Sequence, residues 1–202
     1  LGFAQLIKKQ GLSSVQQLDD LEKIIKASLY AREIIKKLMF FSRQMPMQLV
    51  PVNINDSIEN ILTFIDMRYQ SKSVKIISRL ESNLPTITAD PVQISQVIVN
   101  LLTNAIYAMP KGGTVVVTTE RKQGYIKLIV CDNGSGMTPE VQRKIFEPFF
   151  TTKPVGHGTG LGLSVVHGIV LDHGGSIRVN SKVGKGTDFE VRFPVKVNRK
   201  KR

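Results

Sequence analysis

Glycine stands at every second position from Gly156 to Gly162, immediately before an apolar segment of helical periodicity that runs from Leu163 to Leu171. Glycine lets a backbone approach a ligand closely, and the N-terminus of a helix favours negative charge. The stretch therefore predicts a phosphate-binding loop. Its spacing fits neither of the two commonest glycine-rich nucleotide loops, and glycines also serve as plain entries to a helix. The interpretation therefore depends on the motifs around it.

Three side-chain amides share one face of a predicted helix. Asp90-Pro91 is a strong helix start, and Gln96, Asn100 and Asn104 follow at intervals of four residues. Such a line of amides can be simple surface polarity. Asparagine is, however, a poor helix former, and amide oxygens are suitable ligands for a hard cation such as Mg²⁺. The spacing favours a magnesium site on this helix.

A carboxylate followed by glycines ends a predicted strand at Asp132, with Gly134 and Gly136 after it. This pattern can be only a turn. It also suits an adenine pocket, because a carboxylate accepts a hydrogen bond from the exocyclic amine and glycines leave room for the ring. The segment from Gly184 to Thr187, taken alone, predicts an ordinary hairpin turn.

Composition limits the class of protein. The chain has 202 residues, 42% of them hydrophobic, and a net charge of +12, which indicates an acidic partner or only a soluble surface. The single Cys131 excludes an internal disulfide and suggests a reducing, cytoplasmic compartment. No apolar run predicts a signal peptide or a membrane contact. The chain begins at Leu1 without Met, so we expect it to be a piece of a longer protein.

The chain divides into a helical part and an α/β part. Residues 1–45 predict two helices joined near residues 10–14, and the wide apolar stripe on the second needs a partner. We expect a helical hairpin that dimerises into a four-helix bundle rather than a two-stranded coiled coil or a stripe packed on the second domain. From residue 50 onward, strands and helices alternate. The predicted strands are 49–53, 74–80, 87–89, 114–121, 125–132, 176–181 and 187–194, and the predicted helices are 55–69, capped by Asn55, 91–108, 139–146 and 163–172.

Taken together and in order, these motifs resemble those of one family, the two-component sensor histidine kinases. The resemblance covers about residues 50–195, and residues 1–45 resemble the end of the family's dimerisation helices. Asn100 to Ala105 resembles the N box, Asp132 to Met137 the G1 box, Phe146 to Lys153 the F box, Gly158 to Leu163 the G2 box, and Gly184 to Thr187 the G3 turn. The usual phosphate-accepting His would then lie before Leu1, because His157, His167 and His173 match no acceptor motif.

The resemblance implies an α+β chain. Residues 1–48 would be a dimerisation hairpin lacking the acceptor His, residues 49–197 a two-layer α/β sandwich of the gyrase, Hsp90 and histidine kinase type, and residues 198–202 a basic tail. Asp132 would bind the adenine amine with Thr187 supporting it through water, Asn104 and Asn100 would hold Mg²⁺, and phenylalanines of the F box would anchor a lid. The implied ATP-binding residues are Asn100, Asn104, Tyr107, Ala108, Asp132, Gly134, Gly136, Met137, Phe150, Lys153, Gly158, Thr159, Gly160, Leu161, Gly162, Leu163 and Thr187.

One departure from the family concerns charge. Some relatives carry a basic residue where Tyr107 stands, so the phosphates would depend on Lys153, which can also be an ordinary solvated lysine, and on His157.

The same resemblance selects the reaction. Related ATP hydrolases place a general-base Glu where Asn100 stands, and an amide cannot accept that proton. The expected activity is therefore transfer of the γ-phosphoryl group to a His, for relay to a response regulator receiver domain. Three alternatives remain: an ATP-driven clamp, a serine kinase of the anti-sigma type, and a non-enzymatic basic module that binds nucleic acid. The missing Glu opposes the first, the dimerisation helices the second, and the absence of a nucleic-acid motif the third.

Overall fold

The computed structural model describes residues 18–25, 27–29, 31, 47–69, 73–154 and 158–195. The chain forms two compact units, Leu1–Met45 with Thr151–Thr159 and Pro46–Phe150 with Gly160–Arg202. In the first unit, residues 18–25, 27–29 and 31 are helical, with Leu21 buried and Ile24 exposed. The rest of the predicted helical hairpin lies outside the described residues.

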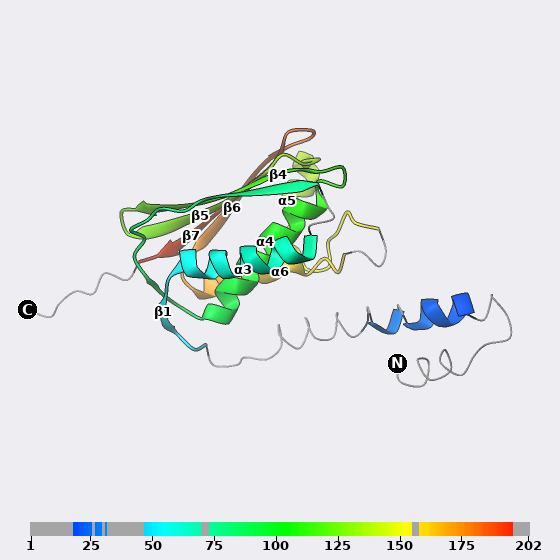
Figure 1. The fold of residues 1–202 in the computed structure, drawn as a ribbon, viewed down its shortest axis with the longest axis horizontal. Coiled ribbons are helices and arrows are strands. Elements are labelled where there is room, and N and C mark those ends of the chain that lie inside the picture. The colour runs from blue at the N-terminus through cyan, green and yellow to red at the C-terminus, as the bar shows by residue number, and fades with distance from the viewer. Residues whose placement is uncertain are drawn as a thin grey trace, which may run out of the picture. The chain divides into compact units, whose positions relative to one another are not determined.

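A mixed five-stranded sheet forms one layer of the second unit (Figure 1). Its spatial order is β2-β4-β5-β7-β6, with β2 parallel to β4 and every other pair antiparallel. The strands are β2 Val74–Arg79, β4 Gly113–Lys122, β5 Tyr125–Asp132, β7 Gly186–Pro194 and β6 Ser176–Lys182. Two short strands, β1 Val50–Val52 and β3 Ile87–Ala89, pair separately and antiparallel.

Helices form the second layer and cover one face of the sheet (Figure 1). They are α3 Ile54–Tyr69, α4 Pro91–Tyr107 and α6 Gly162–Asp172, with the short α5 Pro139–Lys144 near one end of the sheet. The two-layer α/β sandwich predicted from the sequence is therefore confirmed, and its strands and helices lie close to the predicted ranges.

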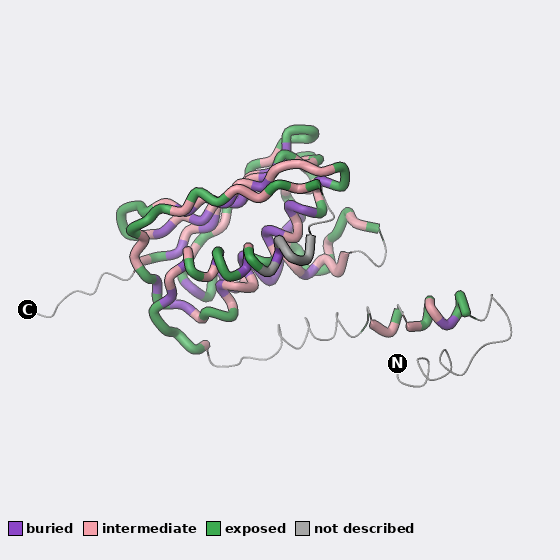
Figure 2. The backbone as a smooth tube through the Cα atoms, in the orientation of Figure 1, coloured by how far each residue is buried: buried purple, intermediate pink, exposed green. Residues whose placement is uncertain are grey.

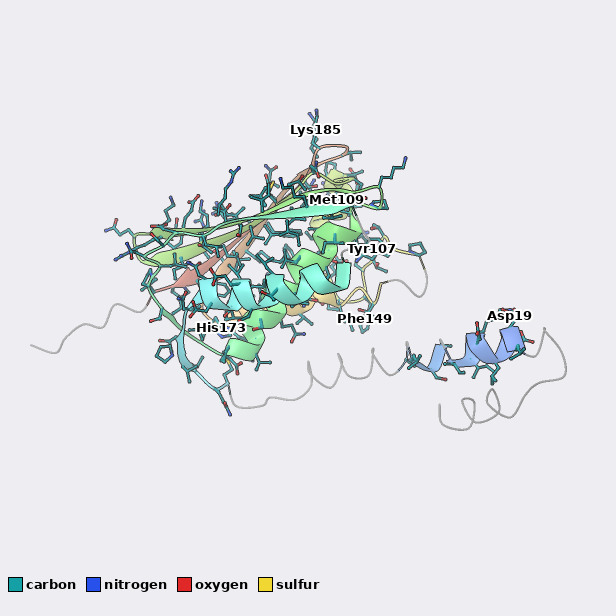
Figure 3. The ribbon with its side chains drawn as sticks, viewed as in Figure 1. Asp19, Tyr107, Met109, Phe149, His173 and Lys185 are labelled. Atoms are coloured by element: carbon teal, nitrogen blue, oxygen red, sulfur yellow. The ribbon has the colours of Figure 1, made fainter. Side chains whose placement is uncertain are left out.

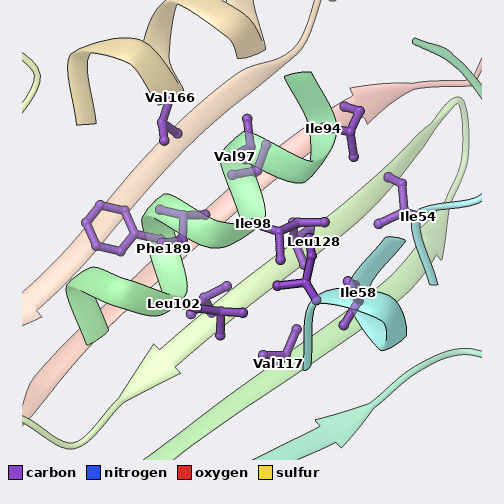
Figure 4. Packing of buried hydrophobic residues seen from close by; sticks show 14 of the residues in the cluster. Ile54, Ile58, Ile94, Val97, Ile98, Leu102, Val117, Leu128, Val166 and Phe189 are labelled. Carbon is purple, nitrogen blue, oxygen red and sulfur yellow. The ribbon is translucent and has the colours of Figure 1, made fainter. Parts of the chain in front are cut away.

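The core lies between α4 and the sheet (Figure 4). Ile98 and Leu102 of α4 face Leu128 of β5, and all three side chains are fully buried. Burial alternates along β5, as expected for a sheet with one face on the core and the other toward solvent (Figure 2). This packing holds the C-terminal end of α4 beside the end of β5.

Local capping starts both long helices. The Asp90 carboxylate accepts the N–H groups of Val92 at 2.9 Å and Gln93 at 3.2 Å, as predicted for α4. For α3 the predicted cap, Asn55, is wrong: the helix begins at Ile54, and Asn53 Oδ1 accepts the Asn55 N–H at 3.0 Å. The Asn55 side chain instead accepts the Thr119 hydroxyl, at 2.9 Å, and so connects the helix to β4.

A buried histidine joins α6 to the start of α4. His173 ends α6, and its Nδ1 lies 2.8 Å from the Ile169 carbonyl oxygen, while Nε2 accepts the Asp90 N–H at 3.0 Å (Figure 3). The second bond requires an unprotonated Nε2, so the proton of the neutral ring sits on Nδ1. The ring also meets Phe193 edge-on, with centroids 6.3 Å apart.

Replacing His173 by Leu should lower the free energy of unfolding by about 1–3 kcal/mol, because the Asp90 N–H and the Ile169 carbonyl oxygen lose this partner. Urea denaturation measures the change. Leu171→Ala is the matched control, since Leu171 is 53% exposed on the same helix, and should change stability by no more than about 0.5 kcal/mol. Equal midpoints for both variants would show that the His173 bonds add nothing.

Candidate active site

Asp132 and Thr187 lie opposite each other at one end of the sheet. Asp132 is the last residue of β5 and pairs in register with Thr187 of β7. Both are buried, with exposed fractions of 5% and 6%. Burial raises the pKa of the Asp132 carboxyl, while the backbone N–H groups of Gly134 and Thr187 lower it. The Gly134 N–H bonds Oδ1 at 2.8 Å. The sequence predicted both residues, and the fold brings them together.

The loop after β5 connects α4 to the β6–β7 hairpin. The Ser135 N–H donates to the Ala108 carbonyl oxygen at 3.0 Å, and the Gly184 N–H donates to the Ser135 carbonyl oxygen at 2.8 Å. These two bonds connect the C-terminal end of α4, which follows the N box, with the G1 loop and the G3 turn.

The two glycines of this loop are required by packing. A Cβ at Gly134 would lie 2.7 Å from the Ala108 carbonyl oxygen, and one at Gly136 would overlap the carbonyl oxygen of Lys182. Gly136 also has a φ of +64°, which disfavours other residues. Room for a base was the reason predicted for these glycines. The structure shows close backbone contact as a second and sufficient one.

Ser181 is a site residue that sequence reasoning missed. Its hydroxyl lies 2.9 Å from Thr187 Oγ1 and accepts the Met137 N–H at 2.9 Å. Gln142 supports the same region by donating to the carbonyl oxygens of Ser181 at 2.9 Å and Met137 at 3.1 Å. A serine near the end of a strand carries no signal of this role in the sequence.

The predicted magnesium ligands lie on α4, where Asn100 and Asn104 are partly buried one turn apart. The Asn100 Oδ1 lies 3.5 Å from where a Cβ would stand on Gly162, the first residue of α6. Among the described residues, no cluster of His, Cys, Asp and Glu could hold a metal ion. Two amide oxygens suit Mg²⁺ that takes its other ligands from phosphates and water, so the residues fit this ion.

The glycine-rich segment enters α6 as expected of an anion site. Leu161, 3% exposed, occupies the N-cap position and makes no side-chain cap hydrogen bond. Gly160 has a φ of +66°, and a Cβ there would overlap the backbone of Phe149. Leu163 lies in the first turn of α6 and packs on the core. Leu161 therefore supplies no side-chain cap to this turn, and the N-terminus of a helix is a favourable position for a phosphate.

The aromatic residues of the F box differ in their packing. The Phe146 ring lies 5.1 Å from the His167 ring, between centroids, and Phe150 packs against the core. Phe149 differs from the expectation of a lid anchor: it is 61% exposed and has a φ of +68° (Figure 3). Its backbone is held against Gly160 rather than its ring being buried.

The structure describes only some of the remaining predicted residues. Tyr107 ends α4 and is 38% exposed (Figure 3). Lys153, Gly158 and Thr159 belong to the other structural unit, in which the Lys153 N–H donates to Thr151 Oγ1 at 3.1 Å. Their contribution to ATP binding stays a prediction. Gly156 and His157 lie outside the described residues.

Cys131 is not a reactive thiol in this arrangement. Burial, with a smaller effect from Asp188, raises the pKa of the Cys131 thiol to about 11. The thiol is therefore protonated at neutral pH and is a poor nucleophile.

The affinity for ATP should fall as the pH is lowered, and the fall should begin at a pH above the usual pKa range of an aspartate. An amine donor binds the ionised carboxylate, and burial raises the pKa of Asp132. Protonation should therefore compete with the nucleotide at a higher pH than for an exposed aspartate. Calorimetric titrations from neutral to acid pH measure this, with urea denaturation confirming that the domain stays folded. A constant affinity across this range would contradict it.

Comparison with known proteins identifies the protein family of the chain. The family model described as histidine kinase-, DNA gyrase B-, and HSP90-like ATPase matches residues 89–197. The chain belongs to this family. Within it, the chain is similar to the sensor histidine kinase ZraS of Escherichia coli (strain K12), with 36% identity over 167 residues, 83% of this chain and 36% of ZraS. The chain spans about a third of the length of ZraS and about a fifth of the length of the sensor kinase CckA of Brucella abortus (strain 2308).

Solved structures agree with this placement. Full-length ShkA in complex with AMPPNP has a TM-score of 0.79 and 26% identity over 96% of this chain and 42% of ShkA. ThkA in complex with the response regulator TrrA has a TM-score of 0.75 and 27% identity over 99% of this chain and 57% of ThkA. The chain therefore carries an ATP-binding catalytic domain of the sensor histidine kinase type. The clamp, serine kinase and nucleic-acid alternatives are not favoured.

Proposed function

We propose that this chain is the kinase core of a sensor histidine kinase, which binds ATP with Mg²⁺ and transfers the γ-phosphoryl group to a His of a dimerisation helix. The observation that carries the proposal is the buried Asp132 carboxylate opposite Thr187, at the junction of the N, G1 and G3 segments. A buried acceptor at the end of a central strand suits the exocyclic amine of adenine.

Each part of the site has a proposed role. Asp132 and Thr187 bind and orient the base, Asn104 and Asn100 hold Mg²⁺, and the first turn of α6 with Gly158 to Gly162 receives the phosphates. When bound, Mg²⁺ neutralises charge on the phosphates during transfer. No carboxylate stands at position 100 to deprotonate water, which favours transfer to a protein nucleophile over hydrolysis.

The division of the chain follows from these roles. We propose a dimerisation part in residues 1–48, an ATP-binding part in residues 49–197 and a basic tail in residues 198–202. The dimerisation part would pair two copies of the chain, and a response regulator receiver domain would take the phosphoryl group from the His.

Among the described residues, no helix combines the length and the apolar character needed to cross a membrane. The single Cys131 supports a reducing, cytoplasmic location.

The test supplies an acceptor in a separate protein. The chain is incubated with γ-labelled ATP, Mg²⁺ and a companion that carries a dimerisation helix with its acceptor His. We expect acid-labile, base-stable label on the companion and none on the chain. His157, His167 and His173 match no acceptor motif, and the last two are also held within the domain by their contacts. ATP binding without any labelling of the companion would count against the kinase, and label on the chain alone would show that the acceptor is misplaced.

A further inference from the structure

We propose that Ser181 is a positioning residue that fixes the Thr187 hydroxyl as a hydrogen-bond acceptor toward the base and so strengthens the preference for adenine. The proposal rests on the nucleotide site proposed above and adds one residue to it. Ser181 lies on β6 opposite Thr187 in the sheet register. It belongs to none of the motifs that the sequence analysis identified.

The hydroxyl of Ser181 makes as many hydrogen bonds as a hydroxyl can. It donates to the Gly186 carbonyl oxygen at 2.9 Å, accepts the Met137 N–H at 2.9 Å, and lies 2.9 Å from Thr187 Oγ1. A hydroxyl has one proton to donate and two lone pairs. The carbonyl can only accept and the N–H can only donate, so in the third bond Thr187 must be the donor.

The opposite arrangement is disfavoured. If Ser181 donated to Thr187, the carbonyl oxygen of the buried Gly186 would lose this donor. Breaking that bond to a buried carbonyl oxygen costs free energy that the Ser181–Thr187 contact does not restore, because this contact exists in either arrangement. Gln142 keeps this geometry in place, because its amide donates to the Ser181 and Met137 carbonyl oxygens.

The direction of this bond decides what the Thr187 hydroxyl can offer to a base beside Asp132. Because its proton is directed to Ser181, the buried Thr187 hydroxyl offers only lone pairs beside the Asp132 carboxylate. Asp132 and the Thr187 hydroxyl therefore present only acceptors to a base in the proposed site. This arrangement suits a purine with an amine at position 6 and opposes one with a carbonyl there.

The test compares ATP with inosine triphosphate, which carries the carbonyl, by calorimetry on the full chain with Mg²⁺. Ser181→Ala frees the Thr187 hydroxyl to donate to that carbonyl. We expect the preference for ATP, the ratio of the two dissociation constants, to fall about tenfold. Ser181→Thr retains a hydroxyl and should keep the ratio. Ser95→Ala is the matched control, because the Ser95 hydroxyl donates to the Pro91 carbonyl oxygen on α4.

Three results would overturn the proposal. An unchanged ratio in Ser181→Ala, with both nucleotides weakened equally or not at all, would show that Ser181 only supports the hairpin. If Ser181→Ala does not fold, Thr187→Val provides an independent test. This variant should also lower the preference for ATP over inosine triphosphate, and a wild-type preference would contradict the proposal. A wild-type chain that binds neither nucleotide would instead refute the site itself, and the present proposal with it.

Discussion

Asp132→Asn should weaken ATP binding about 10²-fold and remove most of the discrimination against GTP. The Gly134 N–H donates to Oδ1 of Asp132, so the asparagine would keep its oxygen there and direct its NH₂ group elsewhere. An adenine amine would then face a donor in place of an acceptor. The wild-type chain should bind GTP, whose base has a carbonyl at this position, about 10⁴-fold more weakly than ATP. Sites that hydrogen-bond a substrate donor reject analogues without that donor to about this extent.

Calorimetry with ATP and GTP measures both effects. Asp188→Asn is the matched control. It also replaces a carboxylate by an amide, and Asp188 directly follows Thr187 in β7. It should leave both affinities unchanged. Undiminished ATP binding in Asp132→Asn, or a wild-type chain that binds GTP as well as ATP, would remove Asp132 from the adenine role.

Asn104→Ala should reduce phosphoryl transfer to a companion His by about 10²-fold or more, a loss comparable to removing one charge-stabilising contact from an active site. The variant should still bind nucleotide through Asp132. The defect should therefore appear in the rate of transfer and in its Mg²⁺ dependence rather than in affinity measured without the metal ion.

Gln96→Ala is the appropriate control, because Gln96 lies on the same face of α4 two turns earlier and is also partly exposed. It should leave transfer unchanged. A normal rate and a normal Mg²⁺ titration in Asn104→Ala would show that the helix holds no magnesium ligand at this position.

Local signals were enough to predict most of the fold. Asp90 followed by Pro91 predicted the start of α4, and the predicted strands 114–121 and 125–132 form the hairpin of β4 and β5 that ends at Asp132. These features depend on neighbours within a few residues. The cap of α3 shows the limit, because Asn53 and Asn55 are both good caps. The Asn55 side chain is engaged by Thr119, which is distant in the sequence.

The candidate site was predicted less completely because part of it exists only after folding. Asp132, Asn100 and Asn104 are recognisable by residue type and spacing. Ser181 acquires its role from contacts with Met137, Gly186 and Thr187, brought together by the β6–β7 hairpin and the loop before α5. Phe149 was expected to help anchor a lid, yet its ring is exposed and its left-handed backbone packs against Gly160.

The asymmetry of α6 has a consequence for hydrogen exchange. Its last turn is fixed by the bonds of His173 to Ile169 and Asp90, whereas its first turn follows Gly160 and has no side-chain cap. Amides near His173 should exchange only when a larger part of the domain opens, while those near Gly162 should exchange through local fraying. A bound nucleotide should slow exchange near Gly162 by contacting the first turn directly, whereas near His173 it should act only through the added stability of the domain. The protection pattern along one helix would therefore separate local occupancy of the site from the overall gain in stability.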